Sequence, residues 1–167
     1  MTQPGRKLLK IEPVVKRITV QCSSADAFRY FTADFDKWWP GHTHSVIAMS
    51  TSGARRPRTC TFEPRIGGRT IEHGAGEERH IWGTVIAWEP PRRVSFTWHP
   101  GRDEQVAQTV DVTFTQTAAG TEVVLTHSGF ERLADEAALI REGYNNGWES
   151  VFNTAFREYV GQHEQHR

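Results

Sequence analysis

The sequence predicts an α+β domain in which a curved antiparallel sheet of about six or seven strands wraps around a long C-terminal helix. Three observations predict this class. Short runs of β-branched and aromatic residues alternate with Gly and Pro turns between residues 58 and 127. Two short helical patterns interrupt the strands early in the chain. An amphipathic pattern closes the chain over residues 144–162, and such a helix must bury its apolar stripe against the sheet.

The first elements are a strand and two short helices. Residues 14–20 are rich in β-branched side chains, which predicts a strand. Ser24 offers a capping hydroxyl to a helix over residues 24–33, because such an oxygen satisfies a free amide N–H of the first turn. Residues 34–39 predict a second short turn of helix, which Pro40 ends, since proline disfavours the α conformation of the preceding residue.

Six further strands follow as an antiparallel meander, because turn residues separate them at short, regular intervals. They are expected over residues 58–64, 69–74, 79–89, 93–99, 106–117 and 121–127. Alternation is clearest in two of these strands, where every second residue is apolar and shares one face of the sheet. These apolar residues are Val94, Phe96 and Trp98, and Val110, Val112 and Phe114.

The last part of the chain is predicted to be helical. The pattern favours a short helix over residues 135–142 and a separate long helix over residues 144–162. One stripe of the long helix is apolar and should face the sheet. Its members are Tyr144, Trp148, Val151, Phe152, Ala155 and Tyr159.

Length and composition favour one domain. A chain of 167 residues with 37% apolar residues can bury one substantial core. We expect a domain over residues 13–162, an N-terminal tail over residues 1–12 and a C-terminal tail over residues 163–167. No apolar run is long enough for a membrane span, and the first residues lack the pattern of a secretory leader, so a cytoplasmic protein is expected.

Charge and cysteine content exclude several classes of partner. Twenty basic and twenty acidic side chains cancel, which gives no global field for nucleic acid or an anionic membrane. The basic residues at positions 55, 56 and 58 are interpreted as a solvated turn. Two cysteines are too few for a disulfide framework. The Gly-containing turns lack the lysine and following helix of a phosphate cradle, so no cofactor is expected.

Several strings, in this order, resemble one known superfamily. They are DKWW at 36–39, FEPRIGG at 62–68, GTV at 83–85, EPPRRV at 89–94, FTW at 96–98, GTEV at 120–123, THSGF at 126–130 and GW at 147–148. With these strings taken together, the chain resembles the START-like, polyketide-cyclase-like superfamily (SRPBCC). Within it, the chain resembles the branch named for homologues of the activator of a heat-shock-protein-90 ATPase. The resemblance implies a helix-grip fold with a deep cavity between helix and sheet. It implies little about activity.

Aromatic residues on the helix stripe and on the strands predict a concave apolar site for a small ligand. The alternative is that these side chains only fill the core. The polar candidates within the strands are Glu72, His73, His80, Thr97, His99 and His127. His127 is the first choice, because it shares one face of its strand with Val123 and Leu125 and can point inward. The predicted ligand-binding residues are Trp38, Trp39, Phe62, Glu72, Trp98, Phe114, His127, Tyr144, Trp148 and Phe152.

Other chemistry is not favoured. His42 and His44 form a His-x-His pair in a Gly-containing loop, but a zinc site needs three or four ligands, and we expect no metal. Ser128 follows His127 directly, yet neighbours in an extended segment point to opposite sides, and no nucleophile elbow surrounds the serine. A serine hydrolase triad is therefore rejected, and catalytic residues are not assigned.

Two functions compete. The first is binding of a small hydrophobic or aromatic molecule, with or without a weak cyclase or hydrolase-like activity. The second is a protein-interaction module that stimulates a chaperone ATPase, as the branch name implies. The chain lacks room for the additional N-terminal domain of the eponymous activator, so the first function is favoured. A homodimer is a further expectation if residues 38–40 form an exposed apolar patch.

Overall fold

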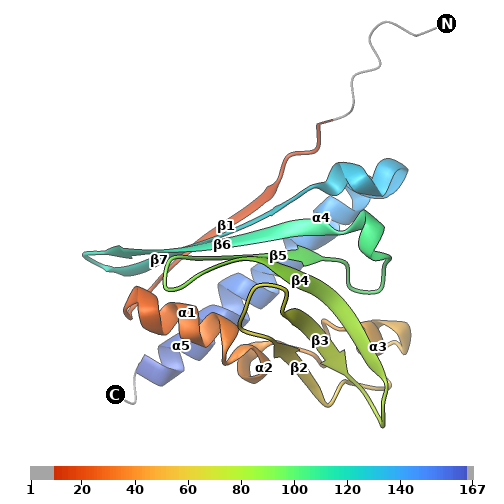
Figure 1. Cartoon of the computed structure of the whole chain (residues 1–167), viewed down its shortest axis with the longest axis horizontal. Helices are drawn as coiled ribbons and strands as arrows, with labels where there is room; N and C mark the ends of the chain where they lie inside the picture. Colours follow the sequence, from red (N-terminus) through yellow and green to blue (C-terminus); the bar gives the residue numbers. More distant parts are fainter. Residues whose placement is uncertain (1–9, 165–167) are drawn as a thin grey trace, which may run out of the picture.

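A seven-stranded antiparallel sheet curls around the C-terminal helix in the computed structural model, which describes residues 10–164. Figure 1 shows the helix running diagonally across the sheet, with the helices α1 and α2 beside its C-terminal half. The order of strands across the sheet is β1-β7-β6-β5-β4-β3-β2. This arrangement confirms the predicted α+β helix-grip class. The strands are β1 Val14–Val20, β2 Thr59–Phe62, β3 Arg69–His73, β4 Arg79–Glu89, β5 Arg93–Trp98, β6 Gln108–Thr117 and β7 Gly120–Ser128.

Period-2 patterning places the core on the concave face of the sheet. Residues of β1 and β7 alternate between buried and more exposed positions along their whole length. Val94, Phe96 and Trp98 of β5 are all buried, as are the apolar residues of β6. Register shifts between Thr70 and Ile71 and between Val85 and Ala87 mark irregularities, which increase local twist and help the sheet to curl.

Three short helices follow β1. The helix α1 spans Ser24–Thr32, and its cap is Ser23 rather than the predicted Ser24, because the Ser23 hydroxyl accepts the Asp26 amide N–H at 3.1 Å. The helix α2 spans Phe35–Trp38, within the predicted turn. The helix α3 spans Val46–Ser50 and was not predicted, since a five-residue helix gives too few turns for a periodic pattern.

The C-terminal helix differs from the prediction. One helical segment runs from α4 (Ala137–Trp148) through a π-helical part (Glu149–Phe156) into α5 (Arg157–Glu164). The prediction of two separate helices was therefore wrong. In the π-helical part the Arg157 amide donates to the Phe152 carbonyl, five residues back. The wider turn buries Phe152 and Phe156, whose rings stack 5.8 Å apart, and leaves Ala155 only half-buried. Phe156 was missed because the 3.6-residue period does not hold there.

The core lies between the sheet, α1, α2 and the π-helical part of the last helix. Phe31 and Phe35 are both about 1% exposed, and they pack on Trp38 with ring centroids 5.2 Å away. Within residues 10–164, no helix has the length and apolarity needed to cross a bilayer. Most of the predicted tails, residues 1–9 and 165–167, lie outside the described residues. The helix α5 continues to Glu164, two residues beyond the predicted end of the domain.

Candidate functional site

A cavity of about 880 Å³ lies between α4, the α3 segment and the ends of β4 and β5. One wall is the sequence-distant helix α4, and the opposite wall is the segment from Thr43 to Ser50. The loop Pro100–Arg102 after β5 closes a third side. The lining residues are Trp39, Thr43, His44, Ser45, Val46, Met49, Ser50, Trp82, Trp98, Pro100, Gly101, Arg102, Leu139, Ile140, Gly143, Tyr144, Gly147, Trp148 and Val151.

Four tryptophans from four parts of the chain meet in this lining: Trp39, Trp82, Trp98 and Trp148. Neighbouring rings in the group are close, with Trp39 and Trp82 centroids 5.2 Å apart and Trp98 and Trp148 centroids 5.6 Å apart. Tilted and edge-on contacts of this kind are the favoured geometries of aromatic pairs. The cluster therefore gives the cavity a broad, rigid aromatic wall.

Two glycines keep the helical wall open. Gly143 and Gly147 lie one turn apart on α4, and both line the cavity. A Cβ atom at either position would meet no other atom within 4 Å. Glycine inside a helix costs about 0.5–1 kcal/mol relative to alanine. No close packing contact requires glycine at these two positions. The absence of side chains there leaves space in front of the tryptophans.

Apolar side chains also stand at the edge of the cavity. Met49 of α3 and Leu139 of α4 are 74% and 78% exposed, although both line the cavity. They come from the two opposite walls. The entrance is therefore apolar as well as the interior, which favours the entry of an apolar molecule.

A chain of hydrogen bonds behind the wall fixes Trp148. The Trp148 indole N–H donates to His127 Nδ1 at 3.0 Å, so His127 carries its proton on Nε2 and donates to Gln108 Oε1 at 3.2 Å. The Gln108 amide then donates to the Val106 carbonyl. Burial lowers the pKa of His127 to about 3, so its ring is neutral at pH 7. His127 faces inward as predicted, but it positions Trp148 and does not line the cavity.

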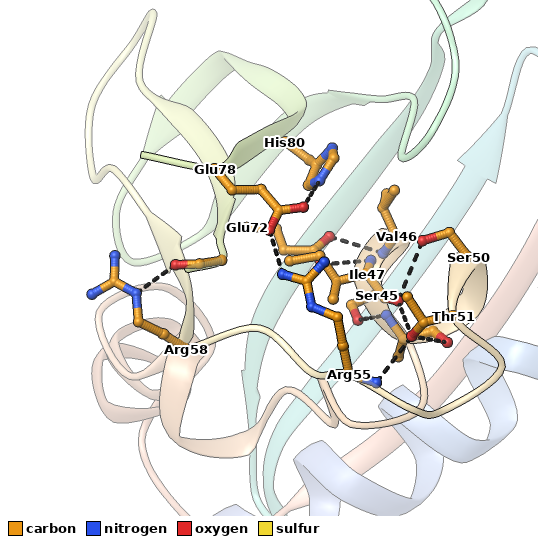
Figure 2. A network of polar contacts seen from close by, with 12 residues as sticks. Ser45, Val46, Ile47, Ser50, Thr51, Arg55, Arg58, Glu72, Glu78 and His80 are labelled. Atoms are coloured by element: carbon orange, nitrogen blue, oxygen red, sulfur yellow. Dashed lines mark hydrogen bonds and ion pairs between the residues drawn. The ribbon is translucent and has the colours of Figure 1, made fainter. Parts of the chain in front are cut away.

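Glu72 anchors the opposite wall. Its fully buried carboxylate accepts the amide N–H groups of Val46 and Ile47, each at 2.8 Å, and these amides begin α3 (Figure 2). It also accepts the indole N–H of Trp82 at 3.0 Å. Satisfying three donors lets a carboxylate remain buried. Glu72 therefore holds both α3 and a wall tryptophan in place, and it does not itself line the cavity.

Two arginines that the sequence suggested were solvated support the segment after α3. Arg55 forms an ion pair with Glu78 at 2.6 Å, and Glu78 also lies 3.4 Å from His80 (Figure 2). Arg58 donates from Nε to the Gly74 carbonyl. These contacts link the segment after α3 to the turn between β3 and β4, while both arginines remain exposed, in agreement with the solvated turn that the sequence indicated.

Four of the ten predicted site residues line the cavity: Trp39, Trp98, Tyr144 and Trp148. The structure places the other six behind the wall or in the core, because their side chains already have packing partners on every side. Trp38, for example, donates its indole N–H to the Tyr30 carbonyl. The six are Trp38, Phe62, Glu72, Phe114, His127 and Phe152.

Sequence reasoning missed the α3 segment and the residues Trp82, Arg102 and His44 as cavity lining. Trp82 lies in β4, where an alternating pattern marks only which face is buried. His44 had been considered as half of a metal pair. In the part of the chain that the structure describes, no three His, Cys, Asp or Glu side chains gather in a way that could hold a metal ion.

The physical basis suggested for a dimer is absent from the described loop at residues 38–40. Trp38 is 5% exposed, and Trp39 is half-buried, with its indole N–H donated to the His44 carbonyl at 2.7 Å. Of the two alternatives for this loop, an exposed apolar patch or part of the pocket, the structure therefore favours the second, and Trp39 lines the cavity.

The curled sheet that grips a C-terminal helix, with a cavity between them, defines a START-like, polyketide-cyclase-like (SRPBCC) protein. Residues 21–161 match the family model described as Activator of Hsp90 ATPase homolog 1-like protein. The match covers well over half of the chain. The chain therefore belongs to the Activator of Hsp90 ATPase homolog 1-like family.

Solved structures support the same fold. A protein from Mesorhizobium loti is 19% identical, with a TM-score of 0.62 over 90% of this chain and 98% of that chain. A protein of unknown function from Staphylococcus aureus is 13% identical, with a TM-score of 0.63 over 96% and 100% of the two chains. An anthrahydroquino-γ-pyrone synthase, solved in complex with a ligand, is 28% identical, with a TM-score of 0.53 over 81% and 88%. Comparison with curated protein sequences finds no significant match.

Proposed function

We propose that this protein binds a small hydrophobic or aromatic molecule in the cavity between the sheet and α4. The observation that carries the proposal is the aromatic wall of Trp39, Trp82, Trp98 and Trp148 facing an open space of about 880 Å³. Ligand sites are typically clefts of about 300–1,000 Å³ with apolar walls and few polar groups. The cavity has this size and this character.

The shape of the site favours flat aromatic ligands over flexible chains. Planar rings can lie against the indoles, and the two glycines of α4 leave room for them in front of this wall. The likeness to an anthrahydroquino-γ-pyrone synthase at 28% identity supports the same preference. We therefore propose fused-ring aromatic compounds of polyketide type as the ligand class.

Few of the lining side chains could take part in catalysis. Within residues 10–164, His44 is the one histidine that lines the cavity, and its Nδ1 lies 2.8 Å from the Thr43 hydroxyl. Burial, with a smaller contribution from His42, lowers the pKa of His44, so the ring is neutral at pH 7 and can accept a proton. A weak cyclase-type proton transfer would involve His44 and Tyr144. We place ligand binding first, because the Thr43 hydroxyl beside His44 is the neighbour in the next position of an exposed loop, and no third group is seen to orient the His44 ring among the described contacts.

Activation of a chaperone ATPase is the alternative suggested by the family description. The described surface offers no feature that favours it over ligand binding. An increase in the ATPase rate of a purified Hsp90-type chaperone on addition of the protein would support this alternative.

The proposal predicts that fused aromatic compounds stabilise the fold. Small molecules extracted from natively purified protein would be identified by mass spectrometry, and fatty acids, aromatics, polyketide-like compounds and terpenoids would be compared by thermal shift. Binding to the native state alone adds about 2.7 kcal/mol at a concentration one hundred times the Kd. We expect a clear rise in Tm with fused aromatics and a smaller rise with fatty acids. No bound molecule and no shift with any class would refute the proposed function.

A further inference from the structure

The lining of the cavity carries a positive charge without a counter-charge. Among the lining residues that the structure describes, Arg102 is the only one with a permanent charge, and none is Asp or Glu. Asp103 follows it in the chain, but this carboxylate accepts the Gln105 amide N–H and so caps the next turn. Among the described residues, no carboxylate forms an ion pair with the Arg102 guanidinium.

A buried donor without a partner lies in the same lining. The indole Nε1 of Trp98 is buried and makes no hydrogen bond within residues 10–164. The other three tryptophans of the aromatic wall each donate their N–H: Trp39 to His44, Trp82 to Glu72 and Trp148 to His127. A buried donor left unsatisfied costs about 1–3 kcal/mol. The Tyr144 hydroxyl lies close enough to interact with the Trp98 N–H, but it does not reach hydrogen-bonding geometry, so this donor is at best weakly satisfied.

The Tyr144 hydroxyl connects the other two groups. Burial raises the pKa of Tyr144, while the Arg102 charge and the Trp98 indole N–H both oppose the rise. Trp98, Arg102 and Tyr144 also line the same cavity, so a ligand there can contact Arg102 and Tyr144 together. Since the hydroxyl keeps its proton at neutral pH, it can donate to an acceptor in the cavity.

We infer that the ligand carries an anionic oxygen, a carboxylate or an ionised phenol, which binds at the Arg102 side of the cavity. Arg102 and Tyr144 donate to this oxygen directly, and a small movement of the Tyr144 ring lets the Trp98 N–H join them. The aromatic body of the ligand lies against the tryptophans. This inference rests on the proposed function and specifies the chemistry of its ligand.

The hydrogen-bond donors Arg102 and Tyr144 explain why the site should prefer an anionic ligand to a neutral one. Hydrogen bonds to a charged oxygen are roughly twice as strong as bonds between neutral groups. No Asp or Glu among the described lining residues repels the anion, and Arg102, an exposed residue, offers its charge at the rim of the cavity. A neutral ligand of the same shape keeps the stacking contacts but loses the charge-assisted ones.

The test compares three ligands of one shape: 2-naphthoate, 2-naphthamide and 2-methylnaphthalene. The Kd of each is measured at pH 7.5 by quenching of tryptophan fluorescence in the full-length protein. We expect 2-naphthoate to bind on the order of tenfold more tightly than 2-naphthamide, which corresponds to about 1.4 kcal/mol. Arg102→Gln and Tyr144→Phe should each bring the Kd of 2-naphthoate close to that of 2-naphthamide in the same variant. Arg56→Gln, an exposed arginine outside the lining, is the matched control and should change nothing.

The outcomes separate the inference from the proposed function. Equal Kd values for the three compounds, or a preference for 2-naphthoate that survives Arg102→Gln, overturn the inference and leave the proposed function standing. Failure of all three compounds to bind overturns both. A weaker preference in high salt with wild type, but not with Arg102→Gln, supports a direct role of the Arg102 charge.

Discussion

Gly147→Leu is expected to reduce the affinity for a fused aromatic ligand at least tenfold while keeping the protein folded. A side chain at this position enters open space, because a Cβ there meets no atom within 4 Å, and Gly147 lines the cavity. A leucine therefore occupies volume that the ligand needs. Replacing glycine in a helix should also add up to about 1 kcal/mol to the free energy of unfolding. Calorimetric titration with 2-naphthoate and urea unfolding measure the two effects.

Gly161→Leu is the matched control for this prediction. Gly161 lies on the same helical segment, in α5, and a Cβ there also meets no atom within 4 Å, but it does not line the cavity. It should show the same gain in stability and an unchanged Kd. Equal affinity of Gly147→Leu and wild type would mean that ligands bind elsewhere.

Glu72→Ala is expected to lower the free energy of unfolding by about 3–5 kcal/mol, the range for removing one partner from a buried charged network. The reason is that the amides of Val46 and Ile47 and the indole of Trp82 lose their shared acceptor. The Ile47 amide and the Trp82 indole N–H become buried donors without a partner, and the part-buried Val46 amide loses its acceptor as well. Urea unfolding measures the loss.

Glu78→Gln provides the comparison, because Glu78 belongs to the neighbouring network but lies at the surface (Figure 2). Its ion pair with Arg55 is exposed to solvent, and such pairs contribute little to stability. The Glu78 variant should unfold close to wild type. A loss below about 1 kcal/mol for Glu72→Ala would show that the α3 segment does not depend on the Glu72 carboxylate.

Local patterns were sufficient to predict the fold. The strand β1 matches its predicted range of residues 14–20, and β4 matches 79–89, because alternation and flanking turn residues mark such strands clearly. The long helix was harder. Its π-helical part changes the residue period, so Phe156 replaces Ala155 in the buried stripe. The sequence also suggested a break in the helix at residue 143, because glycine is unfavourable inside a helix. The cavity in front of Gly143, which the sequence does not show, is what its missing side chain leaves open.

The site was predicted less completely, for a physical reason. Periodicity tells which side chains point inward, but core and cavity wall share the same face, so Phe114 and Trp98 look alike in the sequence. Only the packing of α1 against β6 shows that Phe114 is covered, with the Phe28 ring 5.2 Å away. The roles of the polar residues could not be predicted for the same reason. Glu72 and His127 do face inward, but each is bonded to a residue far away in the chain. Ile47 lies 25 residues from Glu72, and Trp148 lies 21 residues from His127.

The central claim is that the four-tryptophan wall is the ligand site, and indole NMR tests it most directly. Each tryptophan gives one indole N–H signal in a ¹⁵N-labelled sample, so all six can be followed during titration with 2-methylnaphthalene. The signals of Trp39, Trp82, Trp98 and Trp148 should shift together with one Kd. The signal of Trp88, which packs on Phe28 outside the cavity, should stay in place. A shift of Trp88 without the other four, or no shift at saturating ligand, would contradict the account.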